Sequence, residues 1–128
     1  NRFWPAAHRA GLISKDRDIH HALVHHGIGF TDLVCRTTRR AEEIDPSEFR
    51  SGFERVKSLI EWLKPKVVCF VGLSGWRIVS NPKAKAGIQP ASIGLATVYV
   101  MPHPSGLNAH ASLKDLIGHF SKVRELNA

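Results

Sequence analysis

"VVCFVG", residues 67–72, is the stretch that decides the fold of this chain. A short, continuous apolar run that is rich in β-branched residues is typical of a strand buried on both faces, as in a parallel sheet covered by helices. A second strong strand is predicted at "ATVYVM", residues 96–101, and a weaker strand or an extended loop at "IGFTDLV", residues 28–34. Because helix-like segments separate these runs, we expect an α/β fold.

The clearest of those helices begins at "DPSEF", residues 45–49. Asp45 is a natural N-cap, Pro46 suits the first helical position, and Glu48 completes a capping box. Apolar residues recur at helical spacing along one face, so this face must pack on another element. They are Phe49, Phe53, Val56, Ile60 and Leu63.

Four further helices are predicted from capping residues and helix breakers. They cover residues 3–10 before Gly11, residues 16–26 before Gly27, the segment "GWRIVS" from Gly75, and the last segment from Ser112, with Asp115 in the capping position. Two strong strands make a narrow sheet for so many helices. We therefore expect a single domain over residues 1–128 whose N-terminal strand is absent from this chain.

Composition favours a globular protein with an anionic partner. The chain has 128 residues, 43% of them hydrophobic, and a formal charge of +7. Nucleic acid is the first partner that this charge indicates and an acidic membrane surface the second, although the charge could also serve only solubility. No apolar run approaches the roughly 20 residues that span a bilayer, and no leader-like segment indicates export. Two distant cysteines favour a reducing compartment.

Four motifs, in one order along the chain, resemble the mismatch-specific uracil-DNA glycosylases, which comprise the bacterial Mug proteins and the eukaryotic thymine-DNA glycosylases. They are "NRFW" (1–4), "GIGFTDLVCRTT" (27–38), "VCFVG" (68–72) and "MPHPSGLNAH" (101–110). The resemblance implies a three-layer α/β/α domain with a mostly parallel central sheet. It also implies an enzyme that flips a mispaired base out of duplex DNA and hydrolyses its N-glycosidic bond.

One part of the family's pattern is missing. Upstream of "NRFW", family members carry a strand that ends in a Gly-Ile-Asn-Pro-like motif, whose asparagine positions the attacking water, and then an aromatic residue that stacks on the flipped base. This sequence contains neither. We expect that the chain is a fragment; the alternative is a shortened homologue that has lost the standard chemistry.

The loop "MPHPSGLNAH" carries the first catalytic candidate. His103 stands where the Mug-like pattern has asparagine, and "HPSGL" resembles the "HPSPL" loop of the broader superfamily, whose histidine stabilises the departing uracil anion. A preorganised N–H donor of this kind typically contributes ~3 kcal/mol. The resemblance also assigns Gly106, Leu107 and Asn108 to a wedge that fills the space left by the base, with Leu107 as its apolar tip. The alternatives are a surface histidine and a leucine of the core.

Asp32 is the second catalytic candidate. Its carboxylate could orient or deprotonate the water, or stabilise an oxocarbenium-like sugar; it could equally cap a local turn. Phe30 and Thr31 flank it and are assigned to the base pocket, although Phe30 could as well be an ordinary core residue.

Phosphate contacts are predicted at three places. Arg36 and Thr37 belong to a basic, hydroxyl-rich turn, Ser74 and Gly75 lie at a helix N-terminus, and Ser105 lies in the wedge loop. The alternative for each of them is solvated surface. The histidines 20, 21, 25 and 26 form a cluster, but its spacing lacks the partners of a metal site, so a surface helix is the simpler interpretation and no metal is expected.

The sequence thus predicts a monofunctional, monomeric glycosylase that acts on uracil, or other damaged pyrimidines, in mismatched duplex DNA. It needs no cofactor because water is the nucleophile, and no lysine is placed for lyase chemistry. We expect it in the cytoplasm with the nucleoid if bacterial, or in the nucleus if eukaryotic, and not at a membrane. The alternatives are a noncatalytic DNA-binding module and, more weakly, a metal-dependent hydrolase.

Overall fold

The computed structural model describes residues 1–34 and 44–128. These residues form a mixed α/β fold around a small open sheet of three strands in the order β1-β3-β2. β1 (Val67–Val71) and β3 (Thr97–Met101) are parallel, whereas β2 (Gly87–Ile88) pairs with β3 in the antiparallel direction. The predicted α/β class is confirmed. β2 was not predicted, because a two-residue strand leaves no periodic pattern in the sequence.

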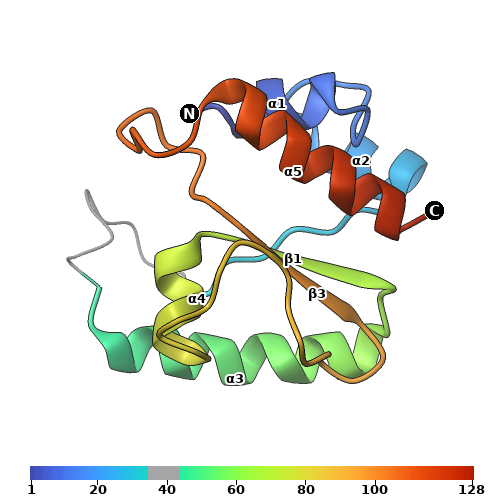
Figure 1. Cartoon of the computed structure of the whole chain (residues 1–128). Coiled ribbons are helices and arrows are strands. Elements are labelled where there is room, and N and C mark those ends of the chain that lie inside the picture. Colours follow the sequence, from blue (N-terminus) through green and yellow to red (C-terminus); the bar gives the residue numbers. More distant parts are fainter. Residues whose placement is uncertain (35–43) are drawn as a thin grey trace.

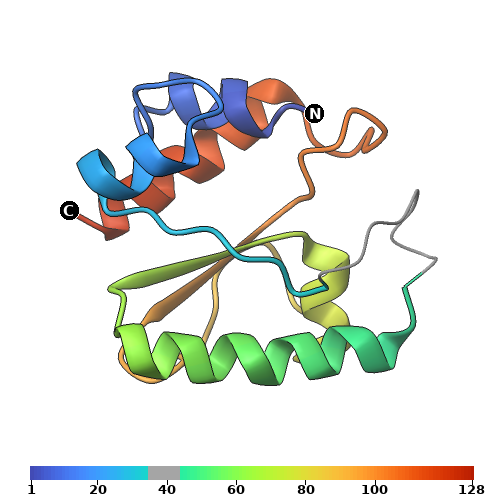
Figure 2. The same ribbon diagram turned by 180° about the vertical axis from the view of Figure 1, so that it is seen from behind.

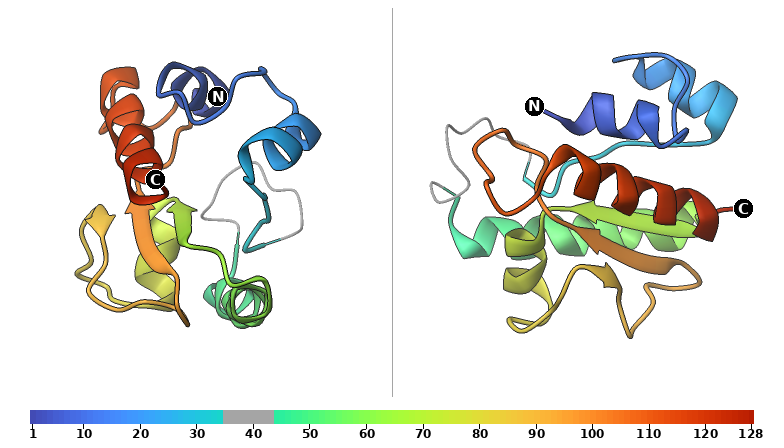
Figure 3. Two further views of the ribbon diagram at one scale, coloured as in Figure 1. Left: turned by 90° about the vertical axis from the view of Figure 1, so that its right-hand side faces the viewer. Right: turned by 45° about the horizontal axis from the view of Figure 1, so that its top comes forward.

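Helices lie on both faces of this sheet (Figures 1 and 3). On one face are α1 (Phe3–Arg9), α2 (Ile19–His26) and α5 (Leu113–Leu126), and on the other α3 (Pro46–Leu63) and α4 (Leu73–Val79). The capping boxes predicted at Asp45 and Ser112 are both formed. Among the described residues no helix is both long and apolar enough to cross a membrane.

The prediction that residues 67–72 form a strand buried on both faces is wrong in one respect. In β1 only Phe70 is buried and its neighbours are half-buried, whereas four of the five residues of β3 are buried. The reason is position: β3 lies in the middle of the sheet and β1 at its edge. Residues 28–34 form no strand but run as an extended segment across the sheet, in front of it in Figure 2.

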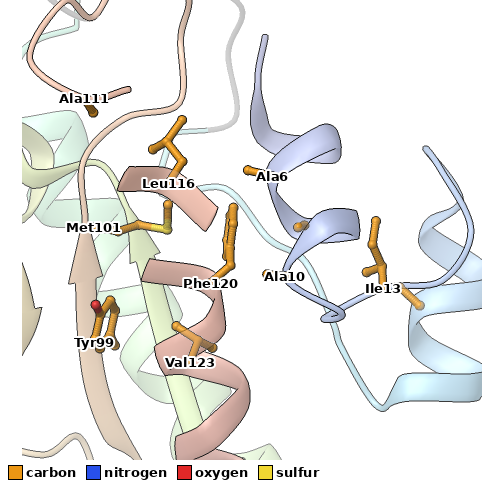
Figure 4. Close-up of a cluster of buried hydrophobic side chains, with 11 residues drawn as sticks. Ala6, Ala10, Ile13, Tyr99, Met101, Ala111, Leu116, Phe120 and Val123 are labelled. Carbon is orange, nitrogen blue, oxygen red and sulfur yellow. The ribbon is translucent and has the colours of Figure 1, made fainter. Parts of the chain in front are cut away.

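The core consists of two clusters, one on each face of the sheet. Successive residues of β3 point to opposite faces, so Tyr99 and Met101 pack towards α1 and α5, and Val98 and Val100 towards α3 and α4. Figure 4 shows the first cluster, in which Met101, like Leu116 of α5, is fully buried. The residues that directly follow Met101 are therefore attached to a fixed point.

Candidate active site

A cavity of about 330 Å³ lies where β1 ends, between the 28–34 segment, α3 and α4. Its walls are mainly apolar, and five residues predicted for the site line it: Thr31, Asp32, Ser74, Gly75 and His103. The carboxyl end of a parallel strand is the usual place for a ligand in an open α/β sheet. The cavity thus joins these five predicted residues from three separate parts of the sequence.

His103 lies in the β3–α5 loop, which comprises residues 102–112. Its Nδ1 accepts a hydrogen bond from the backbone N–H of Ser105 at 3.0 Å, so in the neutral ring the proton resides on Nε2. His103 is an exposed residue, and partial desolvation of its ring lowers its pKa below the ordinary value of 6.5, which favours that neutral form at pH 7. The ring also approaches Gly72, whose φ of +148° suits glycine and where a Cβ would lie 3.8 Å from His103 Cδ2. His103 is therefore a neutral hydrogen-bond donor.

The rest of the loop is held by its own polar groups. Asn108 donates from Nδ2 to the carbonyl oxygen of His103 at 2.9 Å and accepts from the N–H of His110 at 3.1 Å. The N–H of Leu107 donates to Ser105 Oγ at 3.2 Å. The side chain of Leu107 is 90% exposed, so the alternative of a core leucine is wrong. The loop presents one large apolar side chain to solvent, as a wedge requires.

Arg2 was missed by the sequence reasoning, although it touches most of this loop. Its guanidinium donates to the carbonyl oxygens of Pro104 at 3.3 Å, Ser105 at 2.7 Å, Asn108 at 3.2 Å and Ala111 at 2.6 Å. These partners lie more than 100 residues away along the chain. No spacing rule relates residues so far apart, so the sequence held no signal for the contact.

The 28–34 segment places Asp32 at the cavity, and residues of α3 hold this segment in position. Arg55 donates from Nη1 to Thr31 Oγ1 at 3.2 Å and from Nη2 to the backbone carbonyl of Asp32. Gly52, one turn earlier, is buried so closely against the segment that a Cβ would lie 1.6 Å from the carbonyl oxygen of Leu33. Only glycine permits this approach. Neither Arg55 nor Gly52 was singled out from the sequence.

Phe30 lies apart from the cavity, in contrast to Thr31. Its ring is 5.8 Å from that of Phe3 and 5.6 Å from that of Trp4, measured between ring centroids. Phe30 is not among the described residues that line the cavity. The structure thus brings one of the two predicted pocket residues to the cavity, and Phe30 joins the aromatic residues of α1.

The residues predicted to bind phosphate have different surroundings. Ser74 is exposed at the start of α4, whereas Gly75 is buried. A Cβ atom added at Gly75 would lie 3.1 Å from the ring of Phe49. The hydroxyl of Ser105 accepts a bond within the loop. Arg36 and Thr37 lie outside the described residues.

The histidines of α2 contact one another. The ring centroids of His21 and His25 are 4.3 Å apart, and His26 Nε2 lies 2.7 Å from Ser14 Oγ. Desolvation, followed by the charge of His25, lowers the pKa of His21. In residues 1–34 and 44–128 no group of three or more histidine, cysteine, aspartate or glutamate side chains is arranged to hold a metal ion.

The comparison with known families agrees with this geometry. The family model described as "Uracil DNA glycosylase superfamily" matches residues 1–125, which is nearly the whole chain. Members of that superfamily are DNA glycosylases, hydrolases that act on DNA. The match includes the β3–α5 loop, the 28–34 segment and the strands between them. This chain therefore belongs to the uracil-DNA glycosylase superfamily.

Proposed function

We propose that this protein is a monofunctional, monomeric glycosylase that flips uracil, or another damaged pyrimidine, out of a G:U-type mismatch and hydrolyses its N-glycosidic bond. The observation that carries the proposal is His103, a neutral donor that lines the same cavity as Asp32. We further propose that the domain has the three-layer α/β/α arrangement with a mostly parallel sheet. Its mismatch preference resembles that of the Mug and thymine-DNA glycosylase proteins.

The cavity receives the flipped base. Ligand sites commonly measure about 300–1,000 Å³, so a volume of about 330 Å³ suits a small ligand such as a single pyrimidine. Its mainly apolar walls, among them Val68, Phe70 and Val71 of β1, would cover the faces of the base and exclude water. Low polarity strengthens the hydrogen bond that the base receives from the protein.

His103 stabilises the leaving group. As the bond between C1′ of the sugar and N1 of the base breaks, its electron pair moves into the base and negative charge develops on the carbonyl oxygen. The Nε2–H of His103 donates to that oxygen, because Ser105 occupies Nδ1 and thereby fixes the proton on Nε2. The neutral ring needs no proton transfer to play this part.

Asp32 acts on the attacking water and on the sugar. Its carboxylate orients the attacking water, whose oxygen bonds to C1′ while the water proton passes to Asp32 or to solvent. The same negative charge stabilises the cationic character of the sugar. Leu107, with Gly106 and Asn108 beside it, fills the space that the base leaves in the stack. Phosphates meet Ser74 and Ser105, together with Gly75, Arg36 and Thr37.

The test is excision from end-labelled duplexes with one G:U pair, read as alkali-labile strand breaks, with G:C and A:U duplexes alongside. Removing an oxyanion donor typically costs ~10²–10³ in rate, so we expect losses of that order for His103→Ala and large losses for Asp32→Asn. His110→Ala is the matched control, because His110 is an exposed histidine of the same loop.

Three outcomes would count against the proposal. Duplex binding without abasic product at high protein concentration would favour the noncatalytic DNA-binding module. An unchanged rate for His103→Ala or Asp32→Asn would remove that residue from the mechanism. Equal excision from G:U and A:U pairs would contradict mismatch specificity.

A further inference from the structure

We propose that Arg2 is the positioning residue of this site: it holds the β3–α5 loop so that His103 and Leu107 are presented together to one flipped nucleotide. The inference rests on the proposed glycosylase function. It assigns a role to a residue of the "NRFW" motif that does not line the cavity and for which the resemblance gave no role.

Arg2 makes several hydrogen bonds to the β3–α5 loop, and they are spread along it. The four carbonyl oxygens that accept from the guanidinium belong to residues distributed over most of the loop, from Pro104 to Ala111. The backbone N–H of Arg2 adds a fifth bond, to the carbonyl oxygen of Pro104 at 3.1 Å. Arginine offers five N–H donors in a rigid fork, whereas the ammonium of lysine is a compact group with three. The site therefore requires arginine and not merely a positive charge.

The positive charge of Arg2 is compensated within the loop. Arg2 is half-buried, and no carboxylate of the described residues lies within salt-bridge distance of it. Its charge is satisfied by the dipoles of the loop's carbonyl groups. Those oxygens thereby face a cation, which offsets their partial negative charge near a polyanionic partner.

Arg2 is itself held in position by α1, which packs on α5. It precedes α1, and α1 packs on α5 through buried alanines and through Phe3, whose ring centroid is 5.2 Å from that of Phe120. The loop runs from the end of β3 to the start of α5 (Figure 1), so both of its ends are fixed, and Arg2 holds the residues between them.

The contacts lead from Arg2 to both functional side chains. Ser105 gives its carbonyl oxygen to Arg2 and its N–H to His103 Nδ1. Ser105 and Asn108, which both bond to Arg2, flank Leu107, and the hydroxyl of Ser105 accepts the N–H of Leu107. One guanidinium thus sets the donor and the wedge at the same time.

The experiment compares Arg2→Ala and Arg2→Lys with Arg9→Ala, a control in which the exposed arginine at the end of α1 is removed. Amide hydrogen exchange of Ser105 and Leu107 and the tautomer of His103, from ¹⁵N imidazole shifts, report the loop without any substrate. Single-turnover excision of G:U duplex at saturating protein reports the chemistry. Guanidinium ion, at concentrations that do not denature the wild type, is added to Arg2→Ala, with sodium chloride at equal ionic strength as the control.

For both Arg2 variants we expect exchange at the two amides to rise at least about tenfold and excision to slow at least about tenfold, with duplex affinity within about threefold of wild type. Guanidinium should restore part of both losses in Arg2→Ala, and Arg9→Ala should stay within about twofold of wild type. Rescue of this kind distinguishes positioning from a general loss of stability.

Unchanged exchange in both Arg2 variants would overturn the inference, as would faster exchange with unchanged excision. Restoration by sodium chloride as well as by guanidinium would also overturn it, because the effect would then be one of ionic strength. If the wild type excises nothing, the proposed glycosylase function fails. The exchange and rescue data then show separately whether Arg2 holds the loop. Should Arg2→Ala not fold, Arg2→Lys carries the same comparison.

Discussion

The β3–α5 loop and the 28–34 segment both line the cavity, but different forces hold them. The loop is tied by hydrogen bonds among its own residues and to the guanidinium of Arg2. The segment depends on α3, through the side chain of Arg55 and the direct approach of its backbone to Gly52. The loop therefore depends on polar contacts, among its own residues and with Arg2, whereas the segment takes its position from close packing against a neighbouring helix.

The two catalytic candidates, His103 and Asp32, should therefore respond to different kinds of change. His103 depends on polar contacts, which respond to pH and to the loss of a donor. Asp32 depends on close packing, which responds to volume because a packed interface has no free space to take up an added atom. Each of the following predictions changes one side of the comparison and leaves the other in place.

The largest effect is expected from Gly52→Ala. The added methyl group would overlap the carbonyl of Leu33, so the segment must move, at a cost of about 3 kcal/mol in the free energy of unfolding. Excision should fall with it, because Asp32 moves too. Urea unfolding measures the change. Gly118→Ala, with open space around the new methyl group in α5, is the control and should stabilise by about 0.5–1 kcal/mol. Equal stability of the two variants would contradict the close approach.

Acid should loosen the loop and leave the segment in place. Partial desolvation lowers the pKa of His103 from 6.5, so the unfolded chain takes up this proton at a higher pH than the folded chain does. Stability linked to His103 is therefore present above pH 6.5 and is lost as the pH falls below that value. Once protonated, Nδ1 can no longer accept the N–H of Ser105.

Amide NMR between pH 5 and 8 measures this response. The amide of Ser105 should titrate with a midpoint below 6.5, together with the ring of His103, and the amide of Leu33 should not follow it. His21 and His119 also have lowered pKa values because of burial, so His103→Gln is needed to separate the loop from the rest of the fold. A midpoint at or above 6.5 would be inconsistent with a desolvated ring.

Arg55→Ala should have a smaller effect than Gly52→Ala, although both act on the same segment. It removes two hydrogen bonds at an exposed position, which contribute about 1 kcal/mol together. We expect faster amide exchange in residues 31–34 and unchanged exchange at Ser105. Arg50→Ala, an exposed arginine of the same helix, is the control. A loss as large as that of Gly52→Ala would mean that polar contacts hold the segment as well.

The smallest effect on stability is expected from Leu107→Ala. The side chain is 90% exposed, and that of the control Leu95 is 87% exposed, so each replacement should change the free energy of unfolding by less than about 0.5 kcal/mol. Only Leu107→Ala should slow excision from duplex DNA, and much less from single-stranded DNA, which has no stack to fill. Equal slowing on both substrates would remove Leu107 from the wedge.

Features that depend on residues near one another in the sequence were predicted well. The capping boxes at Asp45 and Ser112 formed because their partners lie three residues away. The strands around Phe70 and Val100 were recognised because a run of apolar, β-branched residues must be buried. The loop after Met101 was recognised from its prolines and glycine, and it holds His103 and Leu107 as exposed residues of one loop.

The tertiary structure decided what lies beside these features. It placed β1 at the edge of the sheet, brought Thr31 rather than Phe30 to the cavity, and set Gly52 against the backbone of Leu33. It also joined Arg2 to a loop more than 100 residues away. By itself the sequence determined the helices and the two longer strands, β1 and β3, because local backbone preferences and periodic burial act over a few residues. Only the folded chain determined what holds the two sides of the cavity, because such contacts arise when distant segments pack together.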